Sequence, residues 1–293
     1  MNFLVFVIFV ILEKLIPLFP LKFLYFAARL KARFFYYVIP IRKRVAFTNL
    51  RVAFPEKSNK EIRTIVKKCY LNILIVLVEF FYLRKLSKNQ LGEKFKIVNA
   101  DLIKERFKTG KGIIFVSAHF GNWEIMAYGG ALIFGKPLSV IVKEQTNKQL
   151  DKRINGIREH NGNSMIEMKK AARDVLMSLK ENYIVAMLGD QSAPAESAKV
   201  KFLGKELTAF EGPAVFALKT GAPVFWGVPV RDENYNYSLE AVEIDTSLYK
   251  EYSAENIRDI TQQTMSLLEA YIKKHPDHWL WFHKRFKSLI TYE

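Results

Sequence analysis

The stretch from Gly112 to Glu124 limits the possible folds of this chain most strongly, because it combines an apolar run, a turn and a helix start. Residues 113–116 are apolar and have the length of a buried strand. Gly121 and Asn122 end the run, and Asn122 is a suitable N-cap for a helix that begins near Trp123. This order of elements predicts one strand-turn-helix unit of an α/β sheet.

His119 and Glu124 are the candidate catalytic residues of this unit. His119 lies at the carboxyl end of the predicted strand, where open α/β sheets bind their ligands. Glu124 falls in the first turn of the predicted helix, so its carboxylate can reach one ring nitrogen across the corner. Such a pair makes a general base, because the carboxylate fixes the tautomer and the other nitrogen accepts a proton. The alternative is a histidine that only closes a strand, the commoner outcome for a lone histidine.

The chain beyond Gly92 alternates between predicted strands and predicted helices. We expect strands at 95–98, 113–117, 137–142, 183–188, 223–230 and 237–244, and helices at 101–108, 123–134, 147–160, 170–182, 213–220 and 253–274. A turn at 232–236 predicts an antiparallel edge. The pattern indicates an α/β fold with a mixed sheet flanked by helices.

The first 28 residues are mostly apolar, but Glu13, Lys14 and Lys22 interrupt them. A helix that spans a membrane needs roughly 20 apolar residues, so we expect a membrane anchor that is either an imperfect span or an interfacial helix pair. Basic residues follow, which places the rest of the chain on the cytoplasmic side by the positive-inside rule. They are Arg29, Lys31, Arg33, Arg42, Lys43 and Arg44. The alternative for these charges is an ordinary solvated surface.

A helical basic region is expected at 29–91, and the α/β domain at 92–293. Ser58 and Glu61 form a capping box that begins a long helix. Between residues 69 and 83 only Asn72 and Glu79 interrupt an apolar surface, which favours a buried core helix over one that faces lipid.

The hydrophobic content and the net charge limit the kinds of partner that the chain can bind. Of its 293 residues, 50% are hydrophobic, and the formal net charge is +16. This combination suits nucleic acid or an anionic membrane surface, and the apolar N-terminus favours the membrane. No nucleic-acid-binding motif accompanies the charge. The single cysteine, Cys69, excludes an internal disulfide and a cysteine-based zinc site.

Two further segments carry candidate binding residues. Asp190 and Gln191 follow a predicted strand, so Asp190 either shares the crevice of His119 or is a plain turn residue. Residues 279–287 interleave aromatic and basic side chains, which suits a membrane interface or phosphate recognition by Lys284 and Arg285. The alternative for the tryptophans of that segment is packing against the fold. No residue at metal-like spacing accompanies the histidine in it, so we expect no metal site.

The block from His119 to Glu124, with sequence HFGNWE, resembles the active-site block of the bacterial late acyltransferases of lipid A biosynthesis. Residues 279–287 match the C-terminal signature of the same family. The resemblance implies a glycerolipid-acyltransferase-like fold with an N-terminal membrane anchor. It also implies transfer of a fatty acyl chain from acyl carrier protein to a hydroxyl of an anionic glycolipid, a lipid A precursor, at the cytoplasmic side of the inner membrane. No cofactor is expected.

The resemblance also assigns roles to residues. His119 takes the proton from the acceptor hydroxyl, and Glu124 holds and polarises His119. The family's arginine near the reaction centre is placed on Arg158, although Arg153 is close in sequence. Other expected substrate contacts are Asn122, Asp190, Gln191, Lys284 and Arg285.

Two alternatives to this function stay open at the level of sequence. One is an acyltransferase on another acceptor, such as a phosphatidylinositol mannoside, a lysophospholipid or an aminolipid. The other is a non-catalytic membrane lipid-binding protein that kept the fold.

Overall fold

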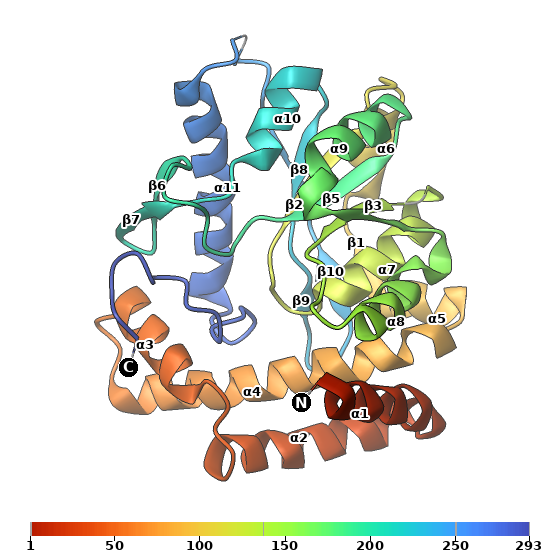
Figure 1. Cartoon of the computed structure of the whole chain (residues 1–293), viewed down its shortest axis with the longest axis vertical. Coiled ribbons are helices and arrows are strands. Elements are labelled where there is room, and N and C mark those ends of the chain that lie inside the picture. The colour runs from red at the N-terminus through yellow and green to blue at the C-terminus, as the bar shows by residue number, and fades with distance from the viewer. Residues whose placement is uncertain (1, 137, 250, 293) are drawn as a thin grey trace.

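A six-stranded sheet forms the centre of the computed structural model, which describes residues 2–136, 138–249 and 251–292 (Figure 1). The strand order is β11-β8-β2-β5-β3-β4. The strands are β2 (Ile113–Ser117), β3 (Leu138–Val142), β4 (Ser164–Glu167), β5 (Ile184–Leu188), β8 (Val224–Trp226) and β11 (Val242–Ile244). Only β11 runs antiparallel to its neighbour, so the predicted mixed sheet with an antiparallel edge is confirmed.

Helices cover both faces of this sheet, which explains why all five residues of β2 are buried. On one face, Ile114 and Val116 pack in a core with α9 (Ala171–Lys180), α10 (Gly212–Thr220) and α11 (Ala254–Lys274). On the other, Ile113 and Phe115 pack in a core with α5 (Lys88–Lys94), α6 (Ala100–Phe107), α7 (Trp123–Phe134) and α8 (Lys148–Arg158). The alternation of side chains along each strand therefore divides the interior into two cores.

Several short strands lie outside the central sheet and were only partly predicted. A three-stranded sheet has the order β1-β10-β9, with β1 (Phe95–Ile97), β9 (Val230–Arg231) and β10 (Tyr237–Leu239). The single strands predicted at 223–230 and 237–244 are wrong, since the first divides into β8 and β9 and the second into β10 and β11, and the two parts of each belong to different sheets. β4 and the hairpin of β6 (Lys199–Phe202) and β7 (Lys205–Thr208) were not predicted, because short strands carry little periodicity.

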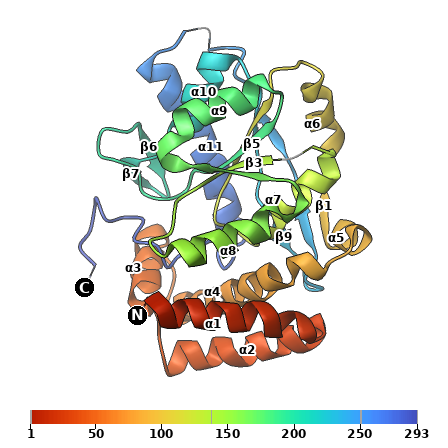
Figure 2. The same ribbon diagram turned by 45° about the vertical axis from the view of Figure 1, so that its right-hand side comes forward.

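Four helices precede the α/β part: α1 (Asn2–Leu15), α2 (Leu21–Tyr37), α3 (Lys43–Ala53) and α4 (Asn59–Tyr82). The predicted capping box of Ser58 and Glu61 is present at the start of α4. α4 crosses below the sheet, and α1 and α2 lie on the side of α4 that faces away from the sheet (Figures 1 and 2). Because α4 contributes Ile62 and Val66 to one core and Phe80 to the other, it is a buried core helix, as predicted.

The apolar N-terminal segment forms two separate helices, α1 and α2, joined by a short 3-10 turn that contains Pro17. In the parts of the chain that the structure describes, no helix combines the length and the apolar character that crossing a bilayer requires. The division into an anchor, a helical basic region and an α/β domain stays a prediction.

Candidate active site

His119 and Asp190 meet where two neighbouring parallel strands end. Ser117 of β2 pairs with Leu188 of β5, so the turns that follow these strands lie side by side. There His119 Nδ1 lies 2.8 Å from Asp190 Oδ1. The other carboxylate oxygen, Oδ2, accepts a hydrogen bond of 2.9 Å from the indole nitrogen of Trp279. Asp190 therefore lies beside His119 at the same edge of the sheet and is not a plain turn residue.

His119 and Asp190 each favour the charged form of the other. Burial acts to lower the pKa of His119, but the charge and the hydrogen bond of Asp190 outweigh it and raise that pKa above 6.5. Burial acts to raise the pKa of Asp190, but His119 and the hydrogen bond from Trp279 hold that pKa below its usual value. Asp190 is 3% exposed and stays a carboxylate, which fixes the proton of a neutral imidazole on Nδ1.

Glu124 is not the hydrogen-bond partner of His119, which corrects the prediction from sequence. Arg158 holds both oxygens of its carboxylate, with Nη2 at 2.6 Å from Oε1 and Nε at 2.9 Å from Oε2. The physical reason is that β5 is the neighbour of β2 in the sheet, so Asp190, which follows β5, reaches the ring of His119, while Glu124 in the first turn of α7 pairs with Arg158 of α8. Glu124 acts on His119 only through its charge, as a smaller contribution than Asp190 to the raised pKa of His119.

Of the two candidate arginines, Arg158 of α8 pairs with Glu124 of α7. Arg153 instead pairs with Glu13 of α1, with Nη1 at 2.6 Å from Oε2. Arg158 and Glu124 are both largely buried, with side chains 24% and 10% exposed. A bidentate pair of this kind fixes the orientation of the guanidinium plane.

Asn122 was expected to contact substrate, and the structure corrects this prediction as well. Its side chain is fully buried, and its Oδ1 accepts from the backbone N–H groups of Glu124 and Ile125. Its Nδ2 donates to Glu79 Oε2 at 2.7 Å. Asn122 is therefore the N-cap of α7, as the sequence also indicated, and its polar atoms are all bonded inside the protein.

The turn that carries His119 is held by backbone contacts with the C-terminal segment. Gly121 N–H donates to His278 O, and Leu280 N–H donates to His119 O. Gly121 has φ 54°, and a Cβ at this position would lie 1.9 Å from the carbonyl oxygen of Pro229. Only glycine fits there, because any side chain would collide with the backbone of Pro229.

The remaining predicted binding residues have different surroundings. The amide nitrogen of Gln191 lies 3.4 Å from His119 Nε2, so Gln191 borders the ring nitrogen that is not bonded to Asp190. Arg285 is 2% exposed and donates to Thr208 O, and burial lowers its pKa to about 10. Lys284 lines a pocket of about 600 Å³ with Arg42, Lys43 and Arg44.

This arrangement offers one ring nitrogen to a substrate. Asp190 occupies Nδ1, the side chain of His119 is 20% exposed, and Nε2 faces Gln191. Such a ring can remove a proton from a hydroxyl, with Asp190 stabilising the imidazolium that results. Sequence reasoning missed the contact of Trp279 with Asp190. The position of Trp279 in the aromatic and basic segment was the available signal.

Comparisons with known proteins identify the family of the chain. The model of the bacterial lipid A biosynthesis acyltransferase family matches residues 2–288. A phosphatidylinositol mannoside acyltransferase of Mycolicibacterium smegmatis is 23% identical over 69% of this chain, and the match covers 65% of that protein. A lipid A biosynthesis palmitoleoyltransferase of Escherichia coli is 21% identical over 84% of this chain and 79% of its own length. A lipid A biosynthesis acyltransferase 2 of Shigella flexneri is 22% identical over 84% of this chain and 78% of its own length.

The family match and the names of these relatives define an enzyme of the acyltransferase class. The chain belongs to the bacterial lipid A biosynthesis acyltransferase family.

Proposed function

We propose that this protein transfers a fatty acyl chain from acyl carrier protein to a hydroxyl of an anionic glycolipid, with His119 as general base. A lipid A precursor is the first candidate acceptor. The observation that carries the proposal is the His119–Asp190 pair, because Asp190 bonds Nδ1 and leaves Nε2, which has a long contact of 3.4 Å with Gln191, for the acceptor hydroxyl.

The chemistry needs no covalent enzyme intermediate. His119 Nε2 takes the proton of the acceptor hydroxyl, and the oxygen attacks the thioester carbonyl. The C–S bond then breaks, and the leaving thiolate takes the proton from the imidazolium. The sequence has no Gly-x-Ser-x-Gly nucleophile motif, and burial raises the pKa of the Cys69 thiol well above its usual value. Direct attack therefore fits this chain better than an acyl-enzyme.

Arg158 stabilises the oxyanion that develops on the thioester carbonyl, and Glu124 orients Arg158 for this role. The bidentate contact between the two side chains supports this assignment. Gln191 borders His119 Nε2 and contacts the acceptor hydroxyl. Glu124 thus keeps a part in catalysis, but it acts through Arg158 and through its charge.

The N-terminal helices attach the protein to the cytoplasmic side of the inner membrane. α2 and the turn before it expose a helical stripe of large apolar side chains: Phe19, Phe23, Phe26, Leu30, Phe34 and Tyr37. α1 exposes a second set: Phe3, Leu4, Val5, Ile8, Ile11 and Leu15. Exposed apolar residues in such number are typical of a lipid contact, and a helix pair lying in the interface fits them.

The basic pocket receives the anionic part of a substrate. Its lining includes Arg42, Lys43, Arg44, Lys284 and Tyr292, and it contains no carboxylate among the residues that the structure describes. Four cations around one pocket attract phosphate groups, which an anionic glycolipid supplies. Arg285 is not among the lining residues, since its side chain is buried and donates to Thr208 O, so the expected substrate contact is assigned to Lys284 alone.

A different glycolipid acceptor is the second candidate. The mycobacterial relative is named as a phosphatidylinositol mannoside acyltransferase, and its identity to this chain is similar to that of the lipid A enzymes. The reaction and the base are the same in both cases, so the acceptor alone distinguishes them.

Purified protein, acyl carrier protein loaded with a fatty acid and a series of acceptors test the proposal. We expect transfer to a lipid A precursor, and loss of at least about 10²-fold in kcat for His119→Ala. His160→Ala is the matched control, since the ring of His160 stacks on Tyr128 of α7. Transfer only to phosphatidylinositol mannosides supports the second candidate. Binding of acceptor without transfer by the wild-type protein, or full activity of His119→Ala, contradicts the proposal.

A further inference from the structure

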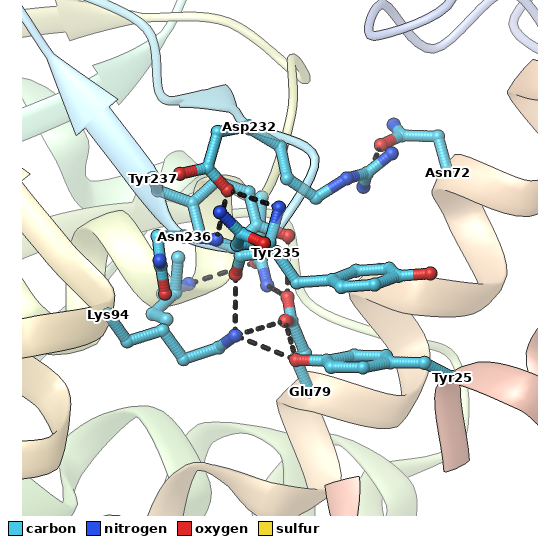
Figure 3. Close-up of polar contacts among 12 residues, drawn as sticks. Tyr25, Asn72, Glu79, Lys94, Asp232, Tyr235, Asn236 and Tyr237 are labelled. Atoms are coloured by element: carbon cyan, nitrogen blue, oxygen red, sulfur yellow. Dashed lines mark hydrogen bonds and ion pairs between the residues drawn. The ribbon is translucent and has the colours of Figure 1, made fainter. Parts of the chain in front are cut away.

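A buried ionic cluster, formed by Tyr25, Glu79, Lys94 and Tyr237, joins the N-terminal helices to the turn that carries His119 (Figure 3). Glu79 is 1% exposed and lies at the centre of the cluster. Its Oε1 accepts from the Tyr25 hydroxyl at 2.6 Å and lies 2.8 Å from Lys94 Nζ. Its Oε2 accepts from the Tyr237 hydroxyl at 2.6 Å and from Asn122 Nδ2 at 2.7 Å.

The cluster brings together elements that are far apart in the sequence. Tyr25 comes from α2, Glu79 from α4, Lys94 from α5 and Tyr237 from β10. Lys94 Nζ also donates to the Tyr25 hydroxyl and to the carbonyl oxygen of Tyr235. The ring centroids of Tyr25 and Tyr235 lie 3.8 Å apart in a stacked arrangement. Figure 3 shows the two rings lying one over the other. The position of α2 is therefore fixed against the sheet by polar contacts.

Each carboxylate oxygen of Glu79 has two donors, as a buried charge in an apolar helix requires. Burial and the charge of Glu79 raise the pKa of both Tyr25 and Tyr237, so both side chains keep their protons and donate. A buried ion pair is not needed for stability, because apolar residues of similar volume often serve as well. The more informative feature is that the pair fixes the position of Glu79, because Glu79 in turn holds the side chain of Asn122.

Asn122 transmits the position of Glu79 to the candidate active site. Its Oδ1 caps α7 at Glu124 N–H and Ile125 N–H, while its Nδ2 is held by Glu79. A second contact from α4 acts on the same turn, since Asn72 Nδ2 donates to Gly121 O at 3.4 Å. The two polar residues that interrupt the apolar stretch of α4 thus both contact the turn between β2 and α7.

We propose that Glu79 is a positioning residue, through which the N-terminal helices set the orientation of the turn that carries His119 and Glu124. This proposal rests on the function proposed above, in which that turn supplies the general base. Glu79 contacts no substrate in it and acts only through Asn122. Small displacements of a catalytic group lower kcat strongly, so the cluster affects kcat more than KM.

Variants that exchange the carboxylate of Glu79 for an amide, and the amide of Asn122 for a carboxylate, test the contact between these two residues. In Glu79→Gln the amide replaces an acceptor that faces Asn122 Nδ2, so we expect kcat to fall about ten-fold or more with little change in KM. In Glu79→Gln/Asn122→Asp the bond is restored with the opposite polarity, and an aspartate still caps α7. We expect the double variant to recover most of the lost kcat. A double variant no more active than Glu79→Gln contradicts the proposal.

A second pair of variants guards against a failure to fold. Tyr25→Phe removes one hydroxyl bond between α2 and Glu79. Tyr70→Phe is its matched control, because the Tyr70 hydroxyl also joins α4 to the segment after α2, by donating to Ile41 O at 2.6 Å, but does not contact the cluster. We expect Tyr25→Phe to lower kcat several-fold and Tyr70→Phe to leave it unchanged at equal thermal stability. Equal kcat in the two variants contradicts the proposal.

The imidazole resonances of His119, measured by NMR on histidine-labelled protein, provide a readout that needs no turnover. They should shift in Glu79→Gln and Tyr25→Phe but not in Tyr70→Phe. If the wild-type protein transfers no acyl chain and yet these shifts occur, the proposed function fails while the positioning role stands. If transfer occurs and the His119 resonances are the same in all variants, the positioning role fails alone.

Discussion

Two charged pairs, His119–Asp190 and Glu124–Arg158, lie at the turn between β2 and α7. They differ in which of their polar atoms a substrate can reach. In the His119–Asp190 pair one ring nitrogen is bonded and the other faces Gln191. In the Glu124–Arg158 pair both carboxylate oxygens are occupied by the same guanidinium. The first pair can accept a proton, whereas the second is a rigid, oriented charge. This difference assigns general base chemistry to His119 and electrostatic support to Arg158.

The largest effect is expected from Asp190→Asn, which removes the charge and the acceptor that fix His119. We expect kcat/KM to fall by about 10² to 10⁴, because an asparagine no longer selects the tautomer with a free Nε2 and does not stabilise the imidazolium. Steady-state kinetics measure the change, and thermal unfolding shows that the variant is folded. An Asp190→Asn enzyme with nearly normal kcat/KM would remove the basis of the comparison.

A smaller effect is expected from Glu124→Gln and from Arg158→Lys. Each variant keeps one hydrogen bond of the pair but loses its bidentate geometry, so we expect kcat to fall about 10- to 100-fold. The two losses should not add in the double variant, because both act on the same guanidinium. Losses that multiply would show that Glu124 and Arg158 serve different steps.

Trp279→Phe tests how much the hydrogen bond to Asp190 contributes to the stability of the His119–Asp190 pair. It removes the indole N–H that donates to Asp190 Oδ2 but keeps an aromatic ring in the core. Hydrogen bonds to charged groups contribute about 1.5–3 kcal/mol, so we expect the free energy of unfolding to decrease by about that amount. Urea denaturation measures it. Trp281→Phe is a suitable control, because its indole donates to the neutral Pro276 O and should cost less.

The smallest effect concerns stability and pH. The pKa of His119 is raised above 6.5 in the folded protein, so the protonated ring contributes stability that is fully present below pH 6.5. This contribution is lost as the pH rises through the folded pKa. The difference in unfolding free energy between the wild type and His119→Gln should therefore be largest below pH 6.5 and decline above it. A difference that is constant with pH would contradict the ion pair.

The central sheet and its helices were predictable from sequence, because their periodicity is long and strong. The strand at 113–117 and the helix at 123–134 were predicted with the bounds that β2 and α7 have. The capping box of Ser58 and Glu61 was predicted from local chemistry alone. The division of 223–230 into β8 and β9 was not, because the order of strands across a sheet is decided by long-range pairing.

The site was partly predictable for the same physical reasons. His119 and Asp190 were both placed at strand ends, but the sequence does not show that β2 and β5 are neighbours. Sequence proximity therefore favoured Glu124 as the partner, whereas adjacency of strands selected Asp190. Glu79 shows the opposite case, since a lone carboxylate in an apolar helix was visible but its four partners were not.

The pH dependence of kcat/KM, measured for the wild type, Asp190→Asn and Glu124→Gln, tests the central claim most directly. A general base must be neutral, so activity should fall on the acid side with an apparent pKa above 6.5 in the wild type. The charge and hydrogen bond of Asp190 raise this pKa, and Glu124 raises it less, so the acid limb should move to lower pH in Asp190→Asn and move less in Glu124→Gln. An acid limb that stays in place in Asp190→Asn, or that moves more in Glu124→Gln, would contradict the account.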